Sequence, residues 1–430
     1  MPTPSFLLIS ENLSEDMKKK GKGRHYSKDD DPSYSSSSIS AAADFEEEEE
    51  EDTHHKNSFS TSMSDIMDRK PAVRVKGFNA TAKHLSSHVI PPEHLESFCE
   101  TLGTYAAKAI ERGSPAEVAA AVQACLAYAA SVGPCDPFYN LVAPACLKAF
   151  STNNSTGGSS TRHLQVQLAA VVNFFCSEDI GETVKLAGLL RAALLETTRK
   201  KRPSALMILE LVRAWNLVAP AVPGGPAENE EDAKQTLCVF MAHITASETS
   251  TELRKECLYG LAILIERLSA GKQQESRWES DASAVTRADF PGLLDVEELE
   301  DACRMAALAA SKKDKAEEQR VFRAVCGYIV DGTKPSATTV KVNRQKLVFG
   351  TWREIYRFGV VSRIFGGHLN THLAGNQVVM DVLGYSMEGA AAAGGFSGHV
   401  HRERDPERAK MTNIKRARDR DAKASSMAWD

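Results

Sequence analysis

Residues 94–128, HLESFCETLGTYAAKAIERGSPAEVAAAVQACLAY, hold two helical segments separated by a turn signal. Apolar residues recur along the first segment at spacings of three and four and form one stripe: Leu95, Phe98, Leu102, Tyr105 and Ala109. At the break, Gly113 suits a helix end, Ser114 an N-cap and Pro115 a first helical turn. Glu117, three residues after Ser114, completes a capping box. The stretch therefore predicts an antiparallel helical hairpin.

Similar helical pairs recur along the chain. Their starts lie roughly 40 to 45 residues apart before insertions, near Pro92, Asp136, Gly181, Glu231 and Leu294. Breaks rich in Gly, Pro, Ser or charge fall at 151–161, 219–229 and 269–284. No run of alternating apolar residues bounded by turns indicates a sheet. This period is typical of an armadillo- or HEAT-like α-solenoid, so the predicted fold class is all-α, an α-solenoid of helical hairpins.

The composition agrees with a globular helical protein. Of 430 residues, 42% are hydrophobic, 25% are charged and only 7% are aromatic, while alanine is abundant, which favours helix over sheet. The net charge of −5 conceals an acidic N-terminal part and a basic C-terminal end. Such asymmetry indicates that the two ends meet different partners.

Cysteine usage and hydropathy predict an intracellular, soluble protein. The nine cysteines are scattered on mostly apolar helical positions without a C-x-x-C pair, as expected for free thiols in a reducing compartment. The apolar run in MPTPSFLLIS is too short for a signal peptide. Because no window approaches about 18 uninterrupted apolar residues, we predict neither a transmembrane helix nor a membrane partner.

The N-terminal residues 1–62 have few apolar side chains and are expected to form a disordered, acidic and serine-rich arm. They include a serine run at 35–38 and an acidic block at 46–52. This arm is either a solvated tail or an acidic segment that docks on a basic partner.

The C-terminal tail is basic. ERAKMTNIKRARDRDAKASSMAWD ends the chain, and seven of its side chains are candidate nucleic-acid ligands: Arg408, Lys410, Lys415, Arg416, Arg418, Arg420 and Lys423. A short basic helix with little apolar surface suits an RNA phosphate backbone, where binding releases counterions. The alternatives are a solvated tail and a nuclear-import signal.

The search for catalytic or metal-binding patterns gives no site. His368 and His372 in HLNTH have the spacing of two zinc ligands on a helix, but Leu369 stands where a metalloprotease needs Glu. In GGFSGH, His399 occupies the last Gly position of a nucleophile elbow. No P-loop, dinucleotide fingerprint or kinase signature is present. We therefore predict no enzyme, no metal, no cofactor and no small-molecule substrate.

Two parts of the chain resemble the interferon-related developmental regulator family. Residues 65–133, from DIMDRKPAVRVKGF to AYAASVG, are similar to the opening of its N-terminal domain. WREIYRFGVVSRIFGGHLNTHLAGNQVVMDVLGY, residues 352–385, is similar to its C-terminal module. The matching positions there are Trp352, Tyr356, Gly366, Gly367, His372, Leu373, Asn376, Asp381, Leu383 and Gly384. The resemblance covers about residues 62–425, with an apparent insertion at 269–292 and a tail interrupted by Asp419 and Asp421.

The resemblance implies a non-enzymatic regulator in the cytoplasm, with nuclear localisation also open. Its partner would be an inactive ribosome and ribosomal RNA, with the basic tail among the RNA. The alternative is a nuclear co-regulator scaffold that binds chromatin or transcription regulatory proteins.

The expected organisation has four parts. These are a disordered arm (1–62), an α-solenoid (63–335), a C-terminal cap module (336–390), and a flexible linker with the basic tail (391–430). The cap is expected to close the last exposed face of the solenoid. Its core would be Trp352, Ile355, Tyr356 and Phe365, with Asn376 capping the final helix. Arg353, Arg357, Arg363 and His368 would be free to face a partner, unless the stretch is only a cap.

Overall fold

The structure is a computed structural model. It describes residues 59–150, 160–200, 204–222, 230–246, 248–275, 297, 301, 315–331, 333–342 and 345–385. The acidic block of the predicted arm and the whole basic tail therefore lie outside the described residues.

The described chain is mostly helical, as predicted. After a helical stretch at 59–66, its helices are α2 (Pro71–Ser87), α3 (Pro92–Glu96), α4 (Cys99–Arg112), α5 (Pro115–Val132), α6 (Asp136–Leu147), α7 (Arg162–Cys176), α8 (Ile180–Thr198), α9 (Ala205–Val218), α10 (Glu230–Thr245), α11 (Thr251–Glu275), α13 (Lys315–Asp331), α14 (Trp352–Phe365), α15 (Leu369–Gly375) and α16 (Gln377–Val382). Short 3-10 turns follow α6, α9 and α14: η1 (Lys148–Phe150), η2 (Ala219–Ala221) and η5 (Gly366–His368).

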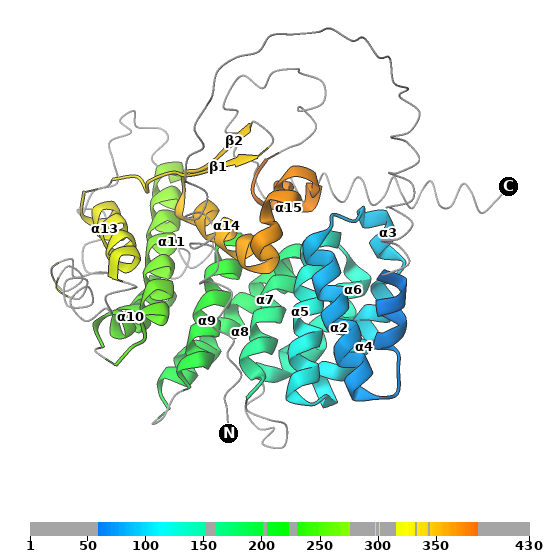
Figure 1. The fold of residues 1–430 in the computed structure, drawn as a ribbon. Helices are drawn as coiled ribbons and strands as arrows, with labels where there is room; N and C mark the ends of the chain where they lie inside the picture. Colours follow the sequence, from blue (N-terminus) through cyan, green and yellow to red (C-terminus); the bar gives the residue numbers. More distant parts are fainter. Residues whose placement is uncertain are drawn as a thin grey trace, which may run out of the picture.

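The helices form two layers (Figure 1). In one layer α2, α5, α7, α9, α11 and α13 pack side by side in chain order. In the other, α4 packs beside α6 and α8 beside α10. Consecutive helices pair across the layers as α4 with α5, α6 with α7, α8 with α9 and α10 with α11. These pairs bury their apolar stripes against one another, as the helical periodicity predicts.

The predicted starts of the helical pairs agree with the structure where it describes them. Helices α6, α8 and α10 begin at Asp136, Ile180 and Glu230, within one residue of the expected positions. The first pair begins with the short α3 at Pro92, followed by α4. The start expected near Leu294 lies outside the described residues.

The turn between α4 and α5 confirms half of the predicted capping box. The Ser114 hydroxyl accepts a hydrogen bond from the Glu117 backbone N–H at 3.3 Å. The Glu117 carboxylate, however, turns away from Ser114 and accepts from Arg74 Nε of α2 at 2.7 Å. Because Glu117 is buried, a charged partner satisfies it better than the turn alone. This ion pair ties α2 to the start of α5.

Helix α5 is buried on nearly all sides and forms the centre of the first half. It contacts α2, α4 and α7 within the array, and α14 and α16 from the C-terminal module. By length and composition this helix qualifies as a membrane span, but 78% of that window is buried inside the fold. A helix that is apolar all round is typical of such a core position.

Two expectations about secondary structure were wrong. The break predicted from residue 269 starts too early, because α11 continues to Glu275. The chain also contains an antiparallel hairpin of β1 (Thr338–Val342) and β2 (Gln345–Phe349), in which Val340 pairs with Leu347. Its alternation spans only five residues per strand, too short to stand out beside the helical repeats.

The C-terminal module does not close the end of the helical array. Helix α14 instead crosses the array and contacts α11, α9, α5 and α2, and α16 packs on α5 (Figure 1). The expectation of an end cap was therefore wrong in its position. The last helices of the described residues return to the first ones, so that the module spans the layer that contains α5.

Candidate interaction surface on helix α14

The N-terminus of α14 is fixed from within the module and from the array. Thr351 and Glu354 form a capping box: the Thr351 hydroxyl accepts from the Glu354 N–H, and Glu354 Oε2 accepts from the Thr351 N–H at 3.1 Å. Glu266 of α11 adds a second carboxylate, which accepts from the Arg353 N–H at 3.1 Å. Negative charge at this end is favoured by the helix dipole, although burial raises the pKa of Glu266.

Apolar and aromatic side chains anchor the inward side of α14. Trp352, Tyr356 and Phe365 are buried and Ile355 is half-buried, so three of the four expected core residues are fully enclosed. Tyr259 of α11 contacts both the Trp352 and Tyr356 rings edge-on, with centroids 6.1 and 5.9 Å apart. The aromatic packing joins the module to α11.

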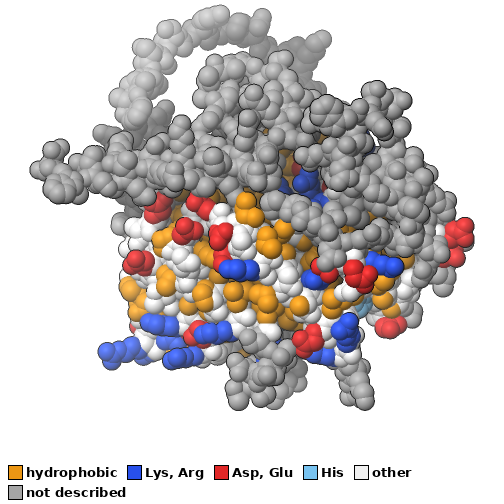
Figure 2. Space-filling model, turned by 180° about the vertical axis from the view of Figure 1, so that it is seen from behind, with side chains coloured by type: hydrophobic (Ala, Val, Ile, Leu, Met, Phe, Trp, Pro, Cys, Tyr) orange, Lys and Arg blue, Asp and Glu red, His pale blue; other side chains and the backbone are white. Residues whose placement is uncertain are grey.

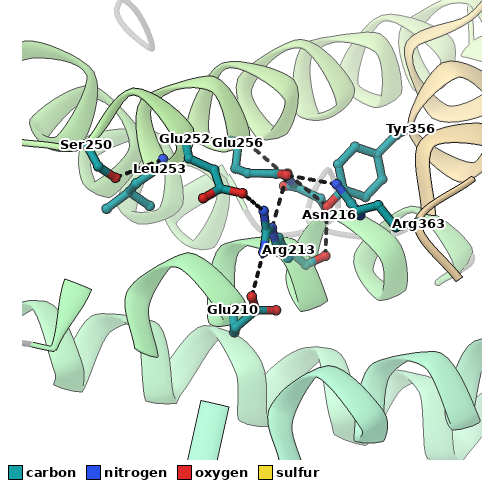
Figure 3. Close-up of polar contacts among 9 residues, drawn as sticks. All are labelled: Glu210, Arg213, Asn216, Ser250, Glu252, Leu253, Glu256, Tyr356 and Arg363. Atoms are coloured by element: carbon teal, nitrogen blue, oxygen red, sulfur yellow. Dashed lines mark hydrogen bonds and ion pairs between the residues drawn. The ribbon is translucent and has the colours of Figure 1, made fainter. Parts of the chain in front are cut away.

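A buried charge network joins α9, α11 and α14 (Figure 3). At its centre Glu256 Oε1 accepts from Arg213 Nε at 3.2 Å and from Arg363 Nη1 at 3.1 Å. The Tyr356 hydroxyl lies 3.0 Å from Glu256 Oε2 and 3.1 Å from the Arg213 carbonyl oxygen, and its single hydrogen is shared between them. Arg213 also donates to Glu210 and Glu252, so two guanidiniums face three carboxylates.

The pKa shifts follow this geometry. Burial by itself would raise the pKa of Glu256, but the Arg363 and Arg213 guanidiniums and the Tyr356 hydroxyl bring it below its ordinary value. Glu210 is also buried and pairs with Arg213, but burial outweighs this and raises its pKa. The network is therefore organised around an ionised Glu256, and its charges stabilise one another.

A second anchor lies at the other end of the module. His372 Nε2 donates to the carbonyl oxygen of Ser86, in the last turn of α2, at 3.0 Å. The Asn376 amide donates toward His372 Nδ1 and the Ala130 carbonyl of α5, both at 3.3 Å. Asn376 Oδ1 accepts from the Val379 N–H at 3.2 Å, which confirms its predicted role as the cap of the last helix.

His372 is thus a neutral structural residue. It is fully buried, it stacks on Phe365 with ring centroids 3.6 Å apart, and burial lowers its pKa to about 4. Both of its ring nitrogens are engaged with protein groups. The described residues contain no group of His, Cys, Asp or Glu side chains arranged to hold a metal ion.

The structure divides the four predicted partner-facing residues into two pairs. Arg363 is 45% exposed although it binds Glu256, and its guanidinium lies over the Tyr356 ring. His368, in η5 just beyond it, is also exposed. Arg353 and Arg357 are half-buried, and Arg357 lies over the Phe174 ring of α7 at 5.3 Å. The seven basic tail residues 408–423 lie outside the described residues.

A further surface, not expected from the sequence, lies on the opposite side. Figure 2 shows apolar side chains across this face and Lys and Arg side chains along its lower edge. Among the exposed large apolar side chains are Val184 and Leu189 of α8, at 47% and 42% exposed. The exposed face of α8 is hard to read from the sequence, because its apolar residues surround the helix instead of forming one stripe.

The sequence reasoning also missed Glu256, Arg213 and Glu266. A signal was present for Arg213, which follows Glu210 inside the apolar run ALMILELVRAWNLV. Charges within such a run indicate buried partners. Nothing local identifies Glu256 as that partner, because it lies 43 residues further along the chain.

The fold and this surface define a helical scaffold whose own C-terminal module is bound across it. Residues 31–330 match the model of the family described as Interferon-related developmental regulator (IFRD). Since the match covers more than half of the chain, the protein belongs to this family of regulators. The matched segment ends within α13, so the resemblance of residues 352–385 to the family's C-terminal module stays a prediction. The comparison with curated proteins gives no match.

Proposed function

We propose that this regulator is a non-enzymatic α-solenoid protein that associates with translationally inactive ribosomes and holds them idle by steric occupation. The basic residues 408–423 would bind ribosomal RNA as the anchor, and the helical array would occupy space needed by tRNA or mRNA. Family membership supports a regulatory role. The observation that carries the RNA contact is the tail itself, with seven Lys and Arg against two Asp between 408 and 423.

The buried polar side chains that hold the module have structural roles, which supports binding over catalysis. Glu256, Arg213 and His372 hold the C-terminal module in place through their own side chains. The exposed pair Arg363 and His368 would contact the partner beside the tail. Residues 386–407 allow the basic segment to reach up to about 70 Å from Tyr385, so the tail and this pair are able to touch separate parts of a large particle.

Sedimentation of cell extract on a sucrose gradient tests the proposal. We expect the full chain in the monosome peak and not in polysomes, and a chain that ends before Arg402 at the top of the gradient. The matched test replaces Arg416, Arg418 and Arg420 by Glu. Its control replaces three exposed lysines of the array by Glu, at Lys83, Lys108 and Lys234, with the same change in net charge.

The tail variant should bind RNA more weakly, and its remaining affinity should depend less on salt. The control variant should bind RNA as the wild type does. Equal binding by the two variants would remove the tail from the mechanism. If every form stays at the top of the gradient in fed and starved cells alike, ribosome binding is refuted. Nuclear enrichment with protein partners that survive RNase would then favour the co-regulator scaffold.

A further inference from the structure

Two cysteines lie in contact at the start of neighbouring helices. Cys99 is the first residue of α4, and Cys135 immediately precedes α6, the helix that packs beside α4. Their sulfur atoms are 3.8 Å apart, and both residues are buried, with 3% of Cys99 and 9% of Cys135 exposed. The two cysteines are 36 positions apart in sequence, so this contact is a product of the fold.

The surroundings make the two thiols unequal. Cys135 stands at the N-cap of α6, close to the Phe138 backbone N–H but without a side-chain capping hydrogen bond. The hydrogen bond with Cys99 and this backbone N–H lower the pKa of Cys135, against burial and the nearby carboxylates Glu96 and Asp136. The same contact and burial raise the pKa of Cys99. Cys135 is also the more exposed of the two, so it is the thiol that an oxidant meets first, and Cys99 is the second thiol of the pair.

We propose that Cys99 and Cys135 are a redox-responsive pair that closes to a disulfide when the protein meets a hydroperoxide. The Cys135 thiolate attacks one peroxide oxygen, the O–O bond breaks, and Cys135 becomes a sulfenic acid while the other oxygen leaves and takes up a proton. Cys99 sulfur then attacks Cys135 sulfur, its proton goes to the leaving oxygen, and water departs. The two thiols lose two electrons and the hydroperoxide gains them.

The two sulfur atoms are already close to bonding distance. A disulfide needs about 2 Å between the sulfur atoms, so they must approach by less than about 2 Å. Cys135 belongs to the short linker between α5 and α6, where its N–H donates to the Cys176 carbonyl oxygen and its carbonyl oxygen accepts from the Tyr139 N–H. Cys135 is only 9% exposed and Pro134 beside it is exposed, so the proposal requires an oxidant as small as a hydroperoxide.

The pair lies next to an attachment point of the C-terminal module. In the same linker Gly133 has a φ of 75°, and a Cβ placed there would come within 2.9 Å of Val378 of α16. One turn earlier, Ala130 accepts the hydrogen bond from Asn376. A disulfide that moves this linker should therefore loosen α16 from α5. This inference does not depend on the proposed ribosome contact.

Mass spectrometry of the full chain after treatment with hydrogen peroxide and alkylation tests the pair. We expect a Cys99–Cys135 crosslinked peptide in the folded protein and its loss when the protein is first unfolded in urea. Cys99→Ser should stop at a sulfenic acid on Cys135, which dimedone traps. Cys135→Ser should give neither product, and Cys238→Ser, at an exposed cysteine, should leave the crosslink unchanged.

Absence of the crosslink at a peroxide dose that oxidises Cys238 would overturn the proposal. So would a crosslink that survives unfolding unchanged. Both outcomes are read in the wild-type chain, so they hold even if a serine variant fails to fold. Hydrogen exchange of the α16 amides, compared before and after oxidation, tests the consequence for the module, and faster exchange is expected after oxidation.

Discussion

Replacing Glu256 by Gln should loosen the C-terminal module from the helical array. Glu256 pairs with both guanidiniums of the network, Arg213 of α9 and Arg363 of α14. Its side chain is 3% exposed, so water does not substitute for it. The Gln amide keeps one acceptor oxygen for Tyr356 but removes the charge, and it turns an N–H₂ donor toward two guanidiniums.

The size of the effect follows from burial. Removing one partner of a buried ion pair costs about 3–5 kcal/mol. Two features reduce this cost in free energy: Arg363 is 45% exposed and partly hydrated, and Arg213 keeps its ion pairs with Glu210 and Glu252. The retained hydrogen-bond acceptor reduces it further, and we expect a loss of about 2–3 kcal/mol in the free energy of unfolding. Glu252→Gln is the matched control, because its side chain, 56% exposed, also binds Arg213 and should cost less than about 1 kcal/mol.

Urea denaturation followed by circular dichroism measures both variants. Hydrogen exchange of the α14 amides adds a local measurement, since a chain of this length need not unfold in one step. We expect faster exchange in α14 for Glu256→Gln alone. If the two variants agree within about 0.5 kcal/mol and exchange alike, the network contributes no more than a surface ion pair and the reasoning is refuted.

We also expect the stability difference between wild type and Glu256→Gln to depend on pH. The pKa of Glu256 is lower in the folded state than in the unfolded chain, so its contribution is present above the unfolded value of about 4.3. It is lost as the pH falls through the folded value. The stability difference between wild type and Glu256→Gln should therefore be constant near neutral pH and shrink below about pH 4. A difference that grows on acidification would contradict this sign.

Three further predictions concern the other anchors. The pKa of His372 is lowered to about 4, so its contribution to stability is complete above the ordinary pKa of about 6.5 and is lost as the pH falls towards 4. Replacing His372 by Gln should therefore flatten this part of the stability curve, measured by thermal denaturation. Gly133→Ala should destabilise the protein by about 1–3 kcal/mol, and adding Val378→Ala should recover part of the loss in a double-mutant cycle, unless the positive φ alone causes the strain. Tyr356→Phe should cost about 1 kcal/mol by urea denaturation, and no change would show that the hydroxyl bonds equally well to water.

The sequence predicted the helical array because its signals are local. The start of α8 depends on the N-cap Asp179, whose side chain accepts from the Gly181 N–H, and α6 has a proline in its first turn. The N-cap role of Asn376 was predictable for the same reason. The site on α14 was harder to predict from the sequence, because its contacts join segments that are distant along the chain. Arg363 and Glu256 are 107 residues apart, and no periodicity connects them.

His372 has a structural role that its spacing from His368 does not reveal. Its spacing from His368 is that of a metal-ligand pair, but the structure separates the two side chains into a buried and an exposed environment. The 3-10 turn η5 between α14 and α15 places His368 at the surface. His372 instead satisfies a carbonyl in the last turn of α2, a need that is visible only once α2 and α15 are in contact.

The position of α14 constrains how this regulator meets any partner. The layer that contains α5 already carries a ligand, the chain's own C-terminal module, held at one end by Glu256 and at the other by His372 and Asn376. A partner that needs this face must displace the module and break both anchors, whereas one that binds at Arg363 and His368 leaves them intact. Variants that weaken one anchor therefore distinguish the two modes: Glu256→Gln should strengthen binding by a partner that displaces α14, because it lowers the cost of release, and should not strengthen binding at the exposed pair.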